Sequence, residues 1–76
     1  MNVRDTLAQN LRKHRLSAKL TQEQLAWKAE LTPDFIGRIE RAERTISVDN
    51  LEKLAKALKI PPHLLLIPES YRENLK

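Results

Sequence analysis

The side chains with the most chemical capacity in this chain are cationic or hydroxylic, because its 76 residues include 14 Lys and Arg, two His and no Cys. His14 and His63 are far apart, and neither has the sequence neighbours of a metal site or a catalytic triad. No glycine-rich phosphate loop or nucleophile motif is present, and the lack of cysteine excludes disulfides and zinc-thiolate sites. The residue types therefore predict a binding protein, not an enzyme, with no metal and no cofactor.

Such side chains need rigid secondary-structure elements to hold them in place. Thr and Ser residues in this chain indicate where helices begin. Three times a Thr or Ser follows one aliphatic residue and precedes another by four positions: Leu20-Thr21 with Leu25, Leu31-Thr32 with Ile36, and Ile46-Ser47 with Leu51. The hydroxyl oxygen can accept a hydrogen bond from the first helical turn, while the aliphatic pair closes as a hydrophobic staple. Gln24 would complete a capping box, and Pro33 suits a first helical position. Each pattern predicts a helix start.

The first two starts are close enough to predict a helix-turn-helix unit. Thr21 and Thr32 are 11 residues apart, so the helix between them has only about two turns. Two short helices joined by a tight turn can present the second helix to a DNA major groove.

Apolar periodicity completes the predicted architecture. We expect helices at roughly residues 2–18, 22–29, 33–41 and 48–59, followed by a short fifth helix after Pro61-Pro62. No segment alternates apolar and polar residues over the length of a strand. The predicted fold is all-α, a compact five-helix bundle forming one domain over residues 1–76.

Size and charge suggest partners for this domain. A core of this size is marginal, so a second subunit would add useful burial and we expect a homodimer. The net charge of +4 favours a polyanionic partner. No apolar segment is typical of a signal peptide or approaches the ~18 residues of a membrane span. We therefore expect a cytoplasmic protein with no membrane association.

A long stretch of the chain resembles a known family. Residues 20–60, LTQEQLAWKAELTPDFIGRIERAERTISVDNLEKLAKALKI, resemble the Xre/Cro-like helix-turn-helix regulators. The matching parts are Leu-Thr-Gln before Leu25-Ala26, Ile-x-x-Ile-Glu ending in Glu40, the Glu-Arg-x-Glu-Arg run, and a Ser-x-x-x-Leu start followed by Leu-Ala-x-x-Leu. Within the family, FIGRIERAERTIS is similar to the controller proteins of restriction-modification systems. The resemblance implies a lambda-repressor-like fold whose second and third helices, about residues 21–41, form the helix-turn-helix.

The chain departs from the family pattern at its turns. Glu30 occupies a turn position where glycine is frequent, because that position favours a left-handed backbone conformation. A residue with a side chain should cost about 1 kcal/mol there. Lys19, Ala42 and Lys59 also replace frequent glycines.

The resemblance implies that the third helix reads base edges. The candidates for base contacts are Thr32, Pro33, Asp34, Gly37, Arg38 and Arg41. The Arg38 guanidinium could donate two hydrogen bonds to guanine O6 and N7, or Arg38 could be a solvated side chain that pairs with Asp34 four residues earlier. Asp34 could accept from cytosine N4 or stabilise the helix dipole. Gly37 lies inside a helix at a cost near 1 kcal/mol, so either DNA or a neighbouring helix must approach it closely.

Other residues match positions that contact phosphates or maintain the fold in this family. The predicted phosphate contacts are Gln22, Arg44, Thr45, Ser47, Lys28 and Lys13, of which the two lysines are weaker candidates. Phosphate contacts position a protein on DNA without reading sequence. Arg15 and Glu40 match a pair that joins the first and third helices, so we expect a buried or half-buried ion pair between them.

The C-terminal apolar run predicts a dimer interface. Leu64, Leu65, Leu66 and Ile67, with Tyr71 beyond them, offer more apolar surface than one short helix can bury on one side. Half of the run should face outward, and the resemblance implies a two-fold contact between these helices in a dimer, over about residues 61–76. The alternative is a segment that covers the core of a monomer.

The sequence therefore predicts a homodimeric regulator that binds a near-palindromic double-stranded DNA operator in a sequence-specific way. One alternative is an antitoxin or another module that binds a protein partner, with DNA binding secondary. A more distant alternative is a domain that keeps the fold without reading bases.

Overall fold

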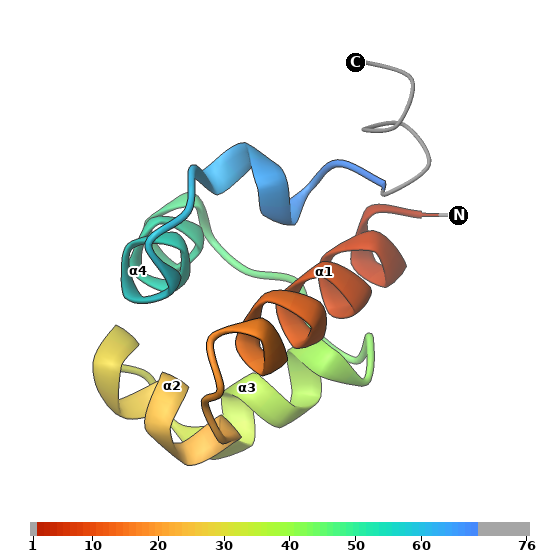
Figure 1. The fold of residues 1–76 in the computed structure, drawn as a ribbon. Coiled ribbons are helices and arrows are strands. Elements are labelled where there is room, and N and C mark those ends of the chain that lie inside the picture. Colours follow the sequence, from red (N-terminus) through yellow and green to blue (C-terminus); the bar gives the residue numbers. More distant parts are fainter. Residues whose placement is uncertain (1, 69–76) are drawn as a thin grey trace.

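The computed structural model describes residues 2–68, and all the regular secondary structure within them is helical (Figure 1). The α-helices are α1 (Val3–Ser17), α2 (Gln22–Ala29), α3 (Pro33–Glu40) and α4 (Val48–Leu58), and a 3-10 helix (Pro62–Leu65) follows. The all-helical prediction is confirmed. The predicted fifth helix is a single 3-10 turn, as is common for short helical segments. None of the described helices combines the length and the apolar character needed to cross a membrane.

Side-chain caps start each α-helix. The Thr21 hydroxyl oxygen accepts from the Gln24 N–H at 3.0 Å, and the Gln24 side-chain oxygen accepts from the Thr21 N–H at 2.8 Å. The other two predicted caps also form, with bonds of 3.1 Å from Phe35 N–H to Thr32 and from Asn50 N–H to Ser47. All three predicted helix starts are confirmed. Asn2 caps α1 in the same way, which the staple pattern did not reveal.

Residues with a left-handed backbone conformation lie at or just after the ends of the helices. Lys19, Glu30, Ala42 and Lys59 have φ angles of 60°, 58°, 62° and 59°. They are the four positions where the family pattern favours glycine, so the chain keeps the turn geometry without the glycines. Glu30 reverses the chain between α2 and α3, and Leu31 N–H closes the turn by donating to Ala26 O at 2.8 Å.

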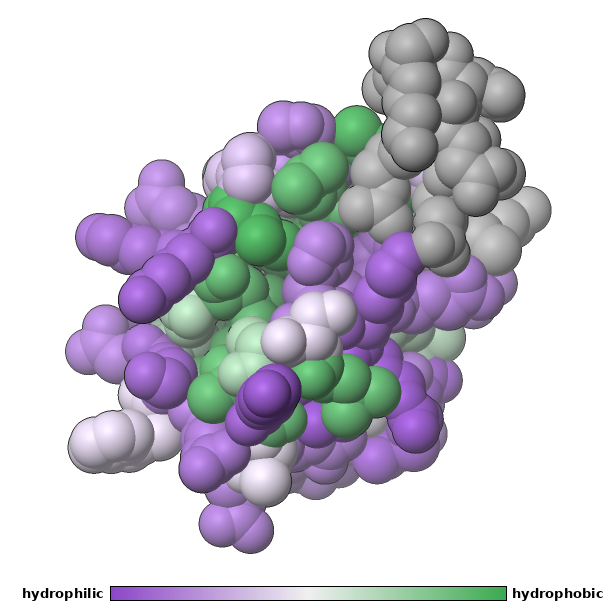
Figure 2. Space-filling model, viewed as in Figure 1, coloured by the Kyte–Doolittle hydropathy of each residue, from purple (hydrophilic) through white to green (hydrophobic). Residues whose placement is uncertain are grey.

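The helices share one hydrophobic core. α3 packs against α1 and α2, while α4 packs against α2 and the 3-10 helix. The largest fully buried side chains come from all five elements: Leu11, Leu25, Ile36, Ile39, Leu54 and Leu65. Figure 2 shows hydrophobic side chains reaching the surface across the middle of one face, with polar side chains on both sides.

A buried asparagine fixes the C-terminal part of this core. The Asn10 side chain on α1 is 4% exposed, and its Nδ2 donates to Leu65 O at 3.1 Å and to Ile67 O at 2.9 Å. These carbonyls lie at the end of the 3-10 helix, where helical partners run out. Asn10 therefore ties the C-terminal segment to α1. The sequence held one indication of this contact, because Asn10 is a polar residue three positions after Leu7 on the apolar face of α1.

Candidate nucleic-acid interface

The N-terminal half of α3 presents polar side chains to solvent. Thr32, Pro33 and Asp34 are exposed, and so is Arg38 one turn later. Arg38 Nε donates to Asp34 Oδ2 at 2.9 Å, and these side chains are 48% and 72% exposed. The pairing considered as an alternative for Arg38 is thus present. An exposed pair of this kind contributes only about 0.3–0.5 kcal/mol, so it would not hold Arg38 against a stronger acceptor.

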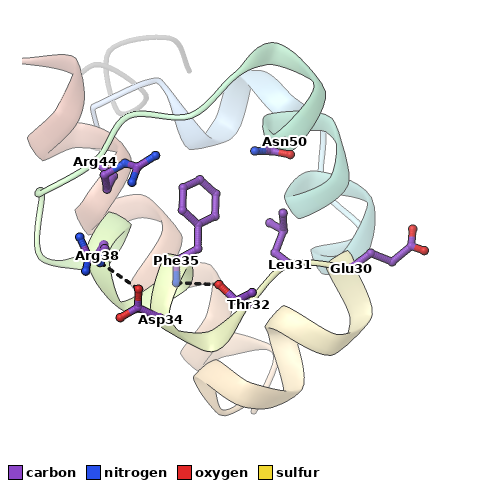
Figure 3. A pocket seen from close by; sticks show the side chains of 8 residues that line it. All are labelled: Glu30, Leu31, Thr32, Asp34, Phe35, Arg38, Arg44 and Asn50. Carbon is purple, nitrogen blue, oxygen red and sulfur yellow. Dashed lines mark hydrogen bonds and ion pairs between the residues drawn. The ribbon is translucent and has the colours of Figure 1, made fainter.

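An open hollow lies between α3, the loop before α4, and the first turn of α4 (Figure 3). Half-buried Leu31 and Phe35 point into it, and Arg44 lies with its guanidinium carbon 5.4 Å from the centre of the Phe35 ring. Asn50 faces the hollow from α4. The residues that line it are Glu30, Leu31, Thr32, Asp34, Phe35, Arg38, Arg44 and Asn50. The hollow combines an apolar floor with cationic side chains at its edge.

This hollow gathers four predicted DNA contacts and, among its other lining residues, one polar residue that sequence reasoning missed. Thr32, Asp34, Arg38 and Arg44 all line it. Asn50 is the missed residue, and the only sequence signal was its place in the first turn of α4, after the Ser47 cap. Its backbone N–H is used by that cap, and its side chain is half-buried beside the hollow.

Arg41 lies at the other end of α3 and pairs with Glu43. Arg41 Nε donates to Glu43 Oε2 at 2.9 Å, with the side chains 57% and 51% exposed. The hydrogen bond from Arg41 lowers the pKa of Glu43 below its ordinary value, and the same bond raises the pKa of Arg41. Both groups are therefore charged near neutral pH.

Glu40 joins α1, α2 and α3 through one carboxylate. Its Oε2 accepts from Arg15 Nε at 2.7 Å, and its Oε1 accepts from Arg15 Nη2 at 3.0 Å and from Gln22 Nε2 at 3.1 Å. Arg15 Nη1 also donates to Leu20 O at 2.9 Å. The Arg15 and Glu40 side chains are only 11% and 5% exposed, so the predicted buried pair is confirmed. The bond from Gln22 to Glu40 was not predicted.

The remaining predicted phosphate contacts are spread over several elements. Arg44, Thr45 and Ser47 are exposed on the loop and cap before α4. Lys13 is exposed on α1. Lys28 lines a second hollow between α2 and α4 together with Lys53 and Lys56, and Glu30 lines both this hollow and the hollow at α3.

The structure corrects the predicted dimer interface at one residue. Leu65 is 0% exposed and belongs to the core of its own chain, so a second copy cannot contact it on the surface, and its prediction was wrong. Asn10 holds the adjoining backbone in place, which turns Leu65 inward. Leu66 is 39% exposed, while Leu64 and Ile67 are half-buried. Tyr71 lies outside the described residues.

A groove next to Leu66 has exposed apolar residues that the sequence did not reveal. Val3 is 67% exposed and Val48 is 81% exposed, and both line this groove with Leu66, Ile46 and Leu51. They start α1 and α4, where nothing in the local pattern distinguishes an exposed valine from a core residue. We call this surface the Val48 groove.

The comparisons with known proteins agree with this geometry. A family model described as helix-turn-helix matches residues 11–65, and the chain belongs to this family. It is a DNA-binding transcription regulator with an all-helical fold.

Its relatives include control proteins. The chain is 42% identical over 66 residues to control protein C.BamHI from Bacillus amyloliquefaciens, covering 86% of this chain and 82% of that protein. It is 43% identical over 76 residues to control protein C.SmaI from Serratia marcescens, covering 100% and 86%. The predicted resemblance to controller proteins is thereby confirmed.

Solved structures show the same fold. The hypothetical transcription factor NHTF from Neisseria has a TM-score of 0.94 at 33% identity, covering 99% of this chain and 86% of that one. The restriction-modification controller protein C.AhdI from Aeromonas hydrophila has a TM-score of 0.79 at 39% identity, covering 82% and 94%.

Proposed function

We propose that this chain is a cytoplasmic controller protein that binds a near-palindromic operator as a homodimer and regulates restriction-modification genes. Residues 1–76 would form a single DNA-binding domain, with α2 and α3 as its helix-turn-helix over about residues 21–41. The observation that carries the proposal is the hollow at α3, where Thr32, Arg38 and Arg44 surround an open surface. The names of the control-protein relatives supply the class of genes.

Base reading is assigned to the exposed side of α3. Thr32, Pro33 and Asp34 would meet base edges at its N-terminal end, with Arg38 and Arg41 farther along, whereas Gly37 is buried and would act through its neighbours. Guanine O6 and N7 could take both donors of the Arg38 guanidinium, a contact worth about 1–3 kcal/mol of discrimination. This exceeds the contribution of the exposed pair with Asp34, so Arg38 can exchange its partner when DNA arrives.

Phosphate contacts are assigned to residues around this helix. Gln22 can serve although Glu40 accepts from its Nε2, because a side-chain amide carries two N–H donors and one remains for a phosphate. Stacking on Phe35 leaves the edge of the Arg44 guanidinium for an anion. Thr45 and Ser47 flank this contact, and Lys13 and Lys28 would add long-range attraction.

The proposed dimer uses the Val48 groove together with the outward-facing part of the C-terminal run. Exposed apolar residues from three separate segments meet there, and burying them requires a partner surface of the same character. Arg4 lines the groove, and Asp49 follows Val48 on the first turn of α4. In a two-fold interface on this groove, Arg4 of one copy and Asp49 of the other are of opposite charge and available to pair. The proposed occupant is a second copy of this chain.

Selection from a random duplex DNA pool, followed by affinity measurements at two salt concentrations, tests the function. We expect enrichment of a two-fold symmetric site and a steep loss of affinity as salt rises. Binding without enrichment would contradict the proposal and direct attention to a protein partner, which co-purification from the native host would identify.

Substitution of Arg38 tests base reading within the selected operator. We expect Arg38→Ala to weaken binding roughly tenfold or more, and to relax the preference at one base pair per half-site. Arg38→Lys should keep the charge without restoring the preference, because lysine lacks the planar two-donor geometry. Lys59→Ala removes an exposed cation that lines no hollow with a proposed DNA contact, and it is the control. An unchanged base preference in Arg38→Ala would refute this assignment.

A further inference from the structure

Gly37 is the only glycine of the chain and lies buried inside α3. Its backbone does not use the left-handed conformation that glycine permits. Glycine also weakens a helix interior relative to alanine. Backbone freedom therefore gives no reason for a glycine here, and the reason must be the space that a side chain would fill.

That space holds the end of a side chain from the same helix. A Cβ atom at residue 37 would lie 3.1 Å from Arg41 Nη1 and 3.6 Å from Gln22 Oε1. The first distance is closer than an ordinary contact, whereas the second is not. The other nitrogens of the guanidinium, Nε and Nη2, face the Glu43 carboxylate at 2.9 and 3.4 Å. The Arg41 guanidinium thus lies between Glu43 on one edge and the bare surface of Gly37 on the other.

We propose that Gly37 is a positioning residue for DNA recognition, because its missing side chain forms a notch that sets the direction of Arg41. The inference rests on the proposed function, in which Arg41 contacts the operator. It differs from both explanations suggested by the sequence, in which DNA or a neighbouring helix approaches Gly37, because the group at short distance is a side chain at the end of the same helix. Gly37 is small because it accommodates Arg41 beside Gln22, and close approach of DNA is not required.

A role of Gly37 in positioning Arg41 predicts a different result from a role in packing the core. A methyl group at residue 37 meets only the far end of a flexible side chain at short distance, so the fold can accommodate alanine by moving Arg41. Alanine is also the better helix former. Stability and DNA recognition should therefore respond to Gly37→Ala in opposite directions.

A double-mutant cycle with Gly37→Ala and Arg41→Ala measures this coupling. We expect Gly37→Ala to weaken operator binding roughly fivefold to tenfold, within the range for a disturbed base contact, with a melting temperature equal to or above that of the wild type. In the Arg41→Ala background, Gly37→Ala should change affinity less than about twofold, because an effect exerted through the Arg41 side chain disappears with that side chain, and this non-additivity is the coupling that the cycle measures. The operator position that relaxes should be the same in both single variants.

Several outcomes would overturn the proposal. An equal loss of affinity in both backgrounds would mean that the methyl group meets DNA or Gln22 itself. Wild-type affinity in Gly37→Ala, or a clear fall in its melting temperature, would refute the proposal that the notch positions Arg41 for DNA recognition. A measurement without DNA separates this inference from the proposed function. The side-chain Nε resonance of Arg41 should shift in Gly37→Ala, and an unshifted resonance would refute the notch whether or not the chain binds an operator.

Discussion

At the scale of single residues, Glu40 has the largest structural role among the predicted contacts. Its carboxylate accepts hydrogen bonds from Arg15 and Gln22 while being 5% exposed. Three helices therefore meet at one buried charge. A buried ion pair is weak evidence for net stability, but breaking one leaves an uncompensated charge inside the protein.

Removing Glu40 should be strongly destabilising. We expect Glu40→Ala to lower the free energy of unfolding by about 3 kcal/mol or more, which for a domain of this size corresponds to a fall of roughly 12–24 °C in melting temperature. Thermal unfolding followed by circular dichroism measures the change. The control is Glu43→Ala, which breaks an exposed ion pair and should shift the melting temperature by roughly 2 °C or less. Equal, small shifts in the two variants would refute the structural role of the Arg15 pair.

At the scale of elements, the positions of the short helices depend on their N-terminal caps and on the turns that reverse the chain between them. α2 and α3 have eight residues each, which is below the length at which an isolated helix is stable. Their caps and the Glu30 turn therefore determine the angle at which α3 leaves α2. The left-handed backbone at Glu30, with φ of 58°, carries a steric cost that glycine would remove.

Replacing Glu30 should reveal this cost. We expect Glu30→Gly to be more stable than Glu30→Ala by about 1 kcal/mol, because only glycine tolerates the left-handed conformation without strain. Both variants remove the carboxylate, so alanine is the matched control for the lost charge. Chemical denaturation of the pair measures the difference. A glycine variant that is no more stable than the alanine variant would show that the turn is not strained.

At the scale of the whole molecule, the proposed DNA surface and the proposed dimer surface share one loop. Arg44 lines the hollow at α3, whereas Thr45, Ile46 and Ser47 line the Val48 groove. A second copy in the groove would therefore lie beside the loop that we propose contacts phosphates. Dimerisation would place two such loops near the centre of the operator.

A charge in the groove should prevent dimer formation. We expect Val48→Asp to give a monomer by light scattering at concentrations where the wild type is a dimer, because an aspartate cannot be buried there without a partner. Val48 is 81% exposed, so the fold should be retained. Leu16→Asp is the control, since Leu16 is 53% exposed on α1 and does not line this groove. A dimeric Val48→Asp variant would exclude this surface while leaving the proposed DNA contacts on α3 untouched.

The sequence by itself determined the local structure of this protein. The Thr21, Thr32 and Ser47 caps and the apolar spacing gave the positions of the helices to within about one residue, because capping and periodicity depend on neighbours in the chain. The resemblance also located Glu30 as a left-handed turn and Arg15 with Glu40 as a pair.

The tertiary structure decided which surfaces these elements leave open. Leu65 is in the core and Val48 is exposed, although their local sequence patterns predict neither. Asn10 reaches a carbonyl 55 residues away, and the Glu40 carboxylate accepts from Arg15 on α1 and Gln22 on α2. Such contacts depend on how separate helices pack in three dimensions. Local periodicity does not specify that packing, so only the folded chain could reveal the hollow and the groove.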